Sequence, residues 1–387
     1  MIPYSTQTIE DEDIDAVKNI LRSPFLTCGP TVNDFEEQTA AYVNANYAVA
    51  VNSCTSALHI AMMALGITAS DRVFVSAISF VASANCARYL GAEVDFIDTD
   101  KNTGNLDVNH LEQMLIEAEK QNRLPKAIVA VHLSGRPVEL EKIYDLKNKY
   151  GFYLIEDAAH ALGAVYKGHK IGDCFYSDIT VFSFHPVKII TTAEGGMCLT
   201  NNEVLYKKMK LYSSHGIEHD KSYLINQTMP NFYYEMQSLG YNYRMSDVHA
   251  ALGISQLSRV DQFLSKRREL AKEWEALLSS DKNLTLPVAD SENSLSAWHL
   301  YQVGIPFGKR DFVYNTLRHR GICVQVHYLP IYRHPYYQNL KNYPLLPGAE
   351  YFFERTLSLP LYPKLKKLDL QMCAATLLGL IDEKKNK

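Results

Sequence analysis

Short apolar runs alternate with helix-like segments through the first half of this 387-residue sequence, and this alternation constrains the fold more than any other feature. The runs typical of strands are residues 72–75, 94–97, 127–131, 152–155 and 179–184. Helical periodicity marks residues 11–23, 55–65, 106–120 and 139–150. Strands that alternate with helices are typical of a mainly parallel sheet with helices on both faces. We therefore predict an α/β fold, in which ligands bind at the carboxyl ends of the strands.

The pattern changes near residue 246, where a second unit begins. Residues 247–278 have helical periodicity, with one bend or break expected inside them. Beyond them we expect strands at 299–305 and 323–328 and helices at 312–320 and 368–381. A chain of this length exceeds one ordinary core. We therefore predict a large domain over residues 1–255 and a smaller α+β domain over residues 256–387.

Composition excludes several classes of function. The net charge of −4 argues against a broad nucleic-acid surface. No apolar run approaches the roughly 18 residues that span a bilayer, and the first residues lack the features of a signal peptide. The seven cysteines are scattered without metal-ligand spacing, so we expect no metal site and a reducing compartment. These observations predict a cytoplasmic protein without a membrane or nucleic-acid partner.

One stretch in the middle of the chain carries the strongest chemical signal. Asp157 follows the predicted strand at 152–155, Ser183 lies near the end of the one at 179–184, and Lys188 and the pair Gly195-Gly196 come after it. A lysine can hold pyridoxal phosphate as a Schiff base, while a carboxylate keeps the ring nitrogen protonated so that the ring accepts electrons. Taken singly, the lysine is best explained as a solvated surface residue, and the aspartate as a helix N-cap. Together they favour a pyridoxal-phosphate enzyme.

Lys188 would then have two functions, covalent attachment of the cofactor and transfer of a proton between substrate and cofactor carbons. A group that shuttles protons must be neutral for part of the time. We therefore expect burial and the neighbouring cation to lower the pKa of Lys188.

Other residues around this stretch are candidate cofactor ligands. Thr55 and Ser56 open a predicted helix whose N-terminus can bind the phosphate, although, taken alone, they are better explained as an ordinary N-cap. Phe80 follows a strand and can lie against the ring, although core packing is the alternative. His160 can contact the ring oxygen or face, and Ser183 the phosphate.

The sequence resembles the sugar-nucleotide aminotransferases related to the DegT proteins, which have the aspartate-aminotransferase fold type I. The likeness runs along nearly the whole chain. Its motifs are residues 2–5, 26–36, 53–59, 156–163, 183–196, 214–217, 239–247 and 357–360. Within that family the sequence is most similar to the pseudaminic-acid pathway enzymes, to judge from Tyr4-Ser5, residues 183–188 and residues 324–328.

The resemblance implies a substrate and an assembly. The pseudaminic-acid pathway enzymes of this family move an amino group from L-glutamate to C4 of a UDP-linked 4-keto-6-deoxy-N-acetyl-L-altrosamine, and the resemblance implies the same reaction here. It implies that Tyr4, His327 and Tyr328 lie near the sugar nucleotide. It also implies a homodimer with shared active sites, in which Asn242 reaches the cofactor phosphate of the neighbouring subunit.

Three positions depart from the family pattern. Ile189 follows Lys188 where near relatives usually have proline, which should be harmless to the chemistry. Ser213 stands where they commonly have arginine, and Leu329 where they often have lysine. These two changes remove positive charge that would face a diphosphate, so they bear on the substrate rather than on the reaction class.

Three alternatives remain open. The first is an aminotransferase for a D-configured 4-keto sugar nucleotide, of the bacillosamine or dTDP-amino-sugar type. The second is a pyridoxamine-dependent sugar dehydratase, but such relatives typically carry histidine at the position of Lys188. The third is a non-catalytic regulator or assembly subunit, which the complete set of cofactor residues disfavours.

Overall fold

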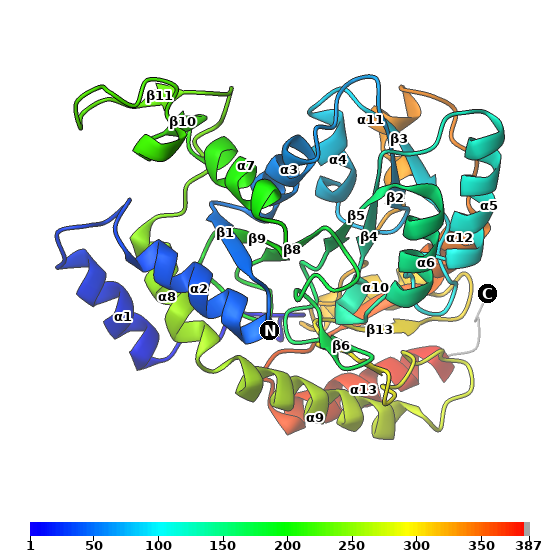
Figure 1. Cartoon of the computed structure of the whole chain (residues 1–387). Helices are drawn as coiled ribbons and strands as arrows, with labels where there is room; N and C mark the ends of the chain where they lie inside the picture. Colours follow the sequence, from blue (N-terminus) through cyan, green and yellow to red (C-terminus); the bar gives the residue numbers. More distant parts are fainter. Residues whose placement is uncertain (383–387) are drawn as a thin grey trace.

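A seven-stranded sheet forms the centre of the computed structural model, which describes residues 1–382 (Figure 1). In spatial order its strands are β1 (Tyr47–Val51), β9 (Gly196–Thr200), β8 (Ile179–Ser183), β5 (Tyr153–Asp157), β4 (Ala127–Val131), β2 (Arg72–Ser76) and β3 (Glu93–Ile97). β9 runs antiparallel to β1 and β8, and the other neighbours are parallel. The predicted α/β class with a mainly parallel sheet is confirmed, and the fold is that of type I aminotransferases.

Helices cover both faces of this sheet because successive strand residues point to opposite sides. In β2, Val73 and Val75 pack on one face and Phe74 on the other. The first face is covered by α3 (Cys54–Ala64), α4 (Ala82–Arg88) and α7 (Glu203–Ser213). The second is covered by α2 (Thr31–Val43), α5 (Val108–Lys120), α6 (Leu140–Tyr150) and α8 (Asp247–Leu257). The result is a three-layer arrangement buried on both sides of the sheet.

A third apolar core lies in the C-terminal part of the chain. It is built on α9 (Val260–Leu278), α10 (Arg310–His319), α13 (Lys367–Asp382) and the antiparallel pair β13 (Tyr301–Gly304) and β14 (Thr356–Leu359). Figure 1 shows α9 and α13 side by side below the main sheet. The expected helix break falls at Ser258–Arg259, between α8 and α9. The division at residues 255 and 256 stays a prediction.

Smaller elements complete the described chain. They are α1 (Asp11–Leu21), α11 (Pro335–Gln338), α12 (Pro347–Arg355), the 3-10 turns η1 (Leu133–Gly135), η2 (Lys221–Tyr223) and η3 (Ile331–Arg333), and the short strands β6 (Val165–Tyr166), β7 (His169–Lys170), β10 (Ile217–Glu218), β11 (Glu235–Met236) and β12 (Ser294–Leu295). Residues 217–239, which contain β10 and β11, form an arm that extends away from the body (Figure 1). None of the helices in residues 1–382 combines the length and apolarity that a membrane crossing requires.

One predicted strand is wrong. Residues 323–328 form no regular strand, and Gln325 makes only an isolated bridge to Ser358. The reason is tertiary: this segment passes along the edge of a pocket, into which His327 and Tyr328 project, instead of adding to a sheet. The strand that does pair with β13 is β14, which was not predicted.

Candidate active site

A pocket of about 370 Å³ opens at the carboxyl edge of the main sheet. The strands β2, β4, β5 and β8 all end there, and the antiparallel strand β9 begins there. Loops that follow parallel strands therefore meet at this edge, as they do at the ligand sites of other α/β proteins. Its volume lies at the lower end of the range of about 300–1,000 Å³ for small-molecule sites.

Nine of the eleven residues predicted for the site line this pocket. They are Tyr4, Thr55, Phe80, Asp157, His160, Ser183, Lys188, His327 and Tyr328. The other two do not. Ser56 is buried beneath it, where its hydroxyl donates to Asn52 Oδ1 at 2.6 Å, and Asn242 is exposed at the base of the arm.

Lys188 lies in the loop between β8 and β9, in contact with the pocket. Burial lowers the pKa of its amine to about 8, while Cys54 and Asp157 act in the opposite direction. The predicted direction is therefore confirmed, but desolvation is the cause and no neighbouring cation contributes. At pH 7 about one amine in ten is neutral, far more than at an ordinary lysine pKa.

Asp157 is held in a fixed orientation by two donors, one of which is itself bonded to a further hydroxyl. Ser79 and Ser83 form a hydroxyl pair at 2.6 Å, and Ser83 donates to Asp157 Oδ2 at 2.5 Å. The backbone N–H of Ala159 donates to Oδ1 at 3.1 Å. Because both oxygens accept a bond and each has a second lone pair, the carboxylate can also accept a proton donor from inside the pocket.

His160 faces the pocket in a defined tautomer. The backbone N–H of Ser134 donates to its Nδ1 at 3.2 Å, so the ring proton is on Nε2, which lies 3.3 Å from Tyr328 Oη. Burial lowers the pKa of His160 well below its ordinary value, and the charge on Lys188 acts in the same direction. The ring is therefore neutral at physiological pH. It also packs against His299 at a centroid distance of 4.3 Å.

The N-terminus of α3 forms one wall of the pocket. Ser53 is its N-cap, accepting a bond from the backbone N–H of Ser56 at 3.1 Å, and Ser53, Cys54 and Thr55 line the pocket. Gly196 lies directly beneath, so close that a Cβ there would be 2.5 Å from the backbone nitrogen of Cys54. Exposed helix N–H groups and a positive dipole end favour a bound phosphate at this wall.

Residues from the N-terminal and C-terminal parts of the chain line another side of the pocket. Tyr4 lies 5.3 Å from His327 between ring centroids, and Phe80 lies 6.3 Å from Tyr328. His327 Nδ1 is 2.8 Å from Ser358 Oγ. Burial lowers the pKa of His327 to about 3, so this side is aromatic and uncharged.

Sequence reasoning missed several residues at the site. The pocket is also lined by Ser53, Cys54, Ser79 and Glu194, and Ser83 orients Asp157. For Ser53 there was a signal, since a serine before an apolar helix is a typical N-cap. Ser79 and Ser83 carried none, because their role depends on a contact with a strand more than 70 residues away. Within the described part of the chain no cluster of metal-ligating side chains occurs.

The pocket residues fit pyridoxal phosphate. The α3 N-terminus suits the phosphate, an oriented carboxylate suits the ring nitrogen, and a lysine of lowered pKa suits the aldehyde. On this fold, that combination defines a pyridoxal-phosphate enzyme of fold type I. A model of the DegT/DnrJ/EryC1/StrS aminotransferase family matches residues 7–378, and the chain belongs to this family. It is an aminotransferase that depends on pyridoxal phosphate.

Three individual relatives are similar to this chain over nearly its whole length. The chain is 39% identical over 389 residues to a Campylobacter jejuni protein named UDP-4-amino-4,6-dideoxy-N-acetyl-beta-L-altrosamine transaminase, covering 100% of this chain and 99% of the relative. The solved structure of Helicobacter pylori PseC, an aminotransferase of pseudaminic acid biosynthesis, superposes with a TM-score of 0.91 at 32% identity, covering 99% of this chain and 100% of that one. A sugar aminotransferase of Streptococcus pneumoniae, solved in a PMP-form, has a TM-score of 0.89 at 27% identity, with coverage of 98% and 99%.

Proposed function

We propose that this chain transfers the amino group of L-glutamate to C4 of a UDP-linked 4-keto-6-deoxy-N-acetylhexosamine, forming UDP-4-amino-4,6-dideoxy-N-acetyl-β-L-altrosamine. The observation that carries the proposal is the presence of Lys188 and the oriented Asp157 in one pocket. The full-length likeness to transaminases named for that product supports the choice of substrate. The structurally similar Helicobacter pylori PseC is an aminotransferase of pseudaminic acid biosynthesis, which supports the same pathway for this chain.

The cofactor, when bound, takes up the amino group and stabilises the negative charge that develops on the adjacent carbon. Lys188 would hold it covalently and Asp157 would hold the ring proton. Ser53, Thr55 and Ser183 would bind its phosphate. His160, which is neutral, and Phe80 would contact the ring.

Lys188 Nζ would also move the proton. A neutral amine accepts a proton from a carbon acid and returns it to a neighbouring carbon, so a pKa of about 8 suits both directions near physiological pH. Asp157 lines the same pocket, and Cys54 and Asp157 both act against the effect of burial on the pKa of the amine.

Tyr4, His327 and Tyr328 would contact the sugar. Their side is aromatic and uncharged, which suits the apolar 6-deoxy edge of such a ring. Ser213 is buried, with its hydroxyl donating to the Lys210 carbonyl at 2.8 Å, and neither it nor Leu329 lines the pocket. The two departures from the family pattern therefore lie outside the residues that line the pocket of this chain.

We also propose a homodimer in which Asn242 of one copy completes the phosphate site of the other. The arm of residues 217–239 carries large apolar side chains that are unusually exposed for one chain alone, namely Ile225 (89%), Phe232 (77%) and Leu239 (72%). Exposed apolar side chains gathered on one element mark an interaction surface. Asn242 lies at the base of that arm, next to Ser214.

The test is a direct assay of both C5 epimers of the UDP-4-keto sugar with L-glutamate and purified holoenzyme. We expect the L-altrosamine precursor to be converted with the higher kcat/KM. A clear preference for the D-configured sugar would overturn the substrate while leaving the reaction class intact. Absence of amino-group transfer to either sugar, with the cofactor bound, would overturn both.

A further inference from the structure

Glu156 is a buried carboxylate to which the proposed reaction gives no role. It precedes Asp157 in β5, and successive strand residues point to opposite faces, so its side chain lies on the far side of the sheet from the pocket. It is only 2% exposed. A buried carboxylate is costly unless its oxygens are hydrogen-bonded, so its partners indicate what it does.

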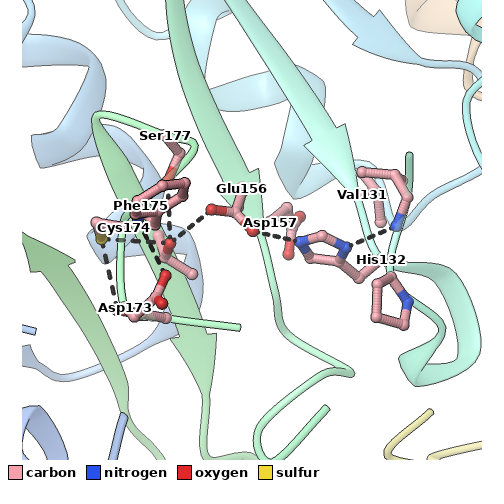
Figure 2. A network of polar contacts seen from close by, with 12 residues as sticks. Val131, His132, Glu156, Asp157, Asp173, Cys174, Phe175 and Ser177 are labelled. Carbon is pink, nitrogen blue, oxygen red and sulfur yellow. Dashed lines mark hydrogen bonds and ion pairs between the residues drawn. The ribbon is translucent and has the colours of Figure 1, made fainter. Parts of the chain in front are cut away.

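Its two partners come from β8 and from the end of β4, the two strands that flank β5. Figure 2 shows the contact between Glu156 and His132. Oε2 lies 2.7 Å from Nε2 of His132, which directly follows β4. The hydroxyl of Thr180 in β8 donates to Oε1 at 3.1 Å. Glu156 therefore bridges three adjacent strands directly behind the residue that faces the cofactor site.

The direction of the His132 bond follows from a third contact. The backbone N–H of Val138 donates to His132 Nδ1 at 3.1 Å, so Nδ1 carries no proton and Nε2 must carry it. His132 is thus a neutral ring that donates to Glu156. His132 and Glu156 are 0% and 2% exposed, so water does not compete for this bond.

The pair is connected to the pocket by two backbone contacts. The N–H of His132 donates to the carbonyl of Asp157 at 3.1 Å, which ties the two positions together on the main chain as well. The bond from Val138 to His132 closes the turn that contains Ser134. Ser134 N–H is the donor that fixes the tautomer of His160 in the pocket.

We propose that His132 and Glu156 are positioning residues, a neutral imidazole donating to a buried carboxylate, that hold Asp157 and the Ser134–His160 contact in place for the cofactor. This inference rests on the function proposed for the pocket. Neither residue lines the pocket, so each acts only through the backbone and side chains that it orients.

The first readout needs no cofactor. In Glu156→Gln the carboxylate charge is lost while size is kept, and we expect amide hydrogen exchange in residues 131–138 of the cofactor-free protein to accelerate about tenfold or more. The second readout is the Kd for pyridoxal phosphate together with kcat and KM for glutamate. Partners that orient metal ligands typically contribute about 10- to 100-fold. We expect an effect of the same order here, with Kd raised, kcat lowered and KM nearly unchanged.

Thr180 provides a second, milder pair of variants in case Glu156→Gln fails to fold. Thr180→Ser keeps the hydroxyl donor and should behave as wild type, whereas Thr180→Val removes the donor at constant size and should weaken cofactor binding. Val313→Ala in α10, a buried residue in the C-terminal core, is the control for general loss of stability. It should lower the melting temperature without changing Kd or exchange in residues 131–138.

The outcomes separate this inference from the proposed function. Wild-type exchange and Kd in folded Glu156→Gln, or equal Kd in both Thr180 variants, would overturn the positioning role and leave the function standing. If wild-type protein bound no pyridoxal phosphate, the proposed function would fail. In that case the amide exchange of residues 131–138 still tests the positioning role, and unchanged exchange in Glu156→Gln would overturn the role of His132 and Glu156 as well.

Discussion

The Lys188 amine acquires its acid–base character from the loss of solvent around it. Burial alone lowers its pKa to about 8, against the opposing effects of Cys54 and Asp157. The sequence predicted the direction of this shift because a proton shuttle needs a neutral fraction. The prediction also attributed part of the lowered pKa to a nearby cation, and no cation contributes to the pKa of this amine in the structure. The charges around the amine come from residues far away in the sequence, so local sequence does not reveal them.

Replacement of Lys188 is the first prediction at this scale. Lys188→Ala should abolish steady-state turnover and leave no covalent attachment point, while the pocket still binds pyridoxal phosphate through its other contacts. Mass spectrometry after borohydride reduction would detect the cofactor on wild-type protein only. Lys188→Arg, which keeps a positive charge but cannot lose it, should be equally inactive. Substantial turnover in the Ala variant would contradict the account.

A second prediction concerns pH. Only the neutral amine reacts with an aldehyde, so the lowered pKa extends reactivity to lower pH than an ordinary lysine allows. The rate at which cofactor-free protein captures pyridoxal phosphate should rise about tenfold per pH unit below about pH 8 and level off above it. Stopped-flow absorbance measures this rate. A rate that keeps rising up to about pH 10 would mean that the amine is not desolvated.

At the scale of elements, the phosphate wall depends on the close approach of β9 to α3. A Cβ on Gly196 would lie 2.5 Å from backbone atoms of Ser53 and Cys54, which cannot move without shifting the helix. Gly196→Ala should therefore weaken pyridoxal phosphate binding about tenfold or more and cost about 1–3 kcal/mol of unfolding free energy.

The matched control for this prediction is Gly379→Ala in α13. A Cβ there meets nothing within 4 Å, and alanine favours a helix interior by about 0.5–1 kcal/mol. It should raise stability and leave the cofactor Kd unchanged, as measured by denaturation and absorbance titration. Equal cofactor affinity in the two variants would show that the β9–α3 contact does not shape the phosphate site.

Strands and helices could be predicted from the sequence where the spacing of apolar residues within the element itself identifies it. The strands β2 to β5 and β8 and the helices α5 and α6 lie within a few residues of their predicted positions, because their apolar periods are regular. β9 was missed since it begins with Gly196 and is defined by antiparallel pairing with β1 and β8. Residues 323–328 have strand composition, but their side chains are used to line the pocket.

At the scale of the whole molecule, the pocket gathers residues from both ends of the chain. Tyr4 and Tyr328 are more than 300 positions apart, and both line it. Periodicity cannot reveal such a pairing, and here only the resemblance to a family implied it. The hydroxyl pair Ser79–Ser83 behind Asp157 had neither a local signal nor a motif, so it was not predicted.

The proposed sharing of active sites between two copies yields the fourth prediction. Asn242→Ala and Lys188→Ala should each be inactive or nearly so as homodimers. When they are mixed and reassembled at equal amounts, half of the dimers are heterodimers, each with one intact site, so about a quarter of wild-type activity should return.

The amount of heterodimer is measured with differently tagged chains. Recovered activity should follow that amount. Full activity of Asn242→Ala alone, or no gain on mixing despite heterodimer formation, would contradict the sharing of sites.

The central claim is that Lys188 and Asp157 form the working centre of a glutamate-dependent transaminase. The most direct measurement is the visible absorbance spectrum of the purified protein, reconstituted with pyridoxal phosphate, before and after addition of L-glutamate. We expect a band of the lysine-bound cofactor that disappears with glutamate and returns when the UDP-4-keto sugar is added. A band that glutamate leaves unchanged, or no band at all, would contradict it.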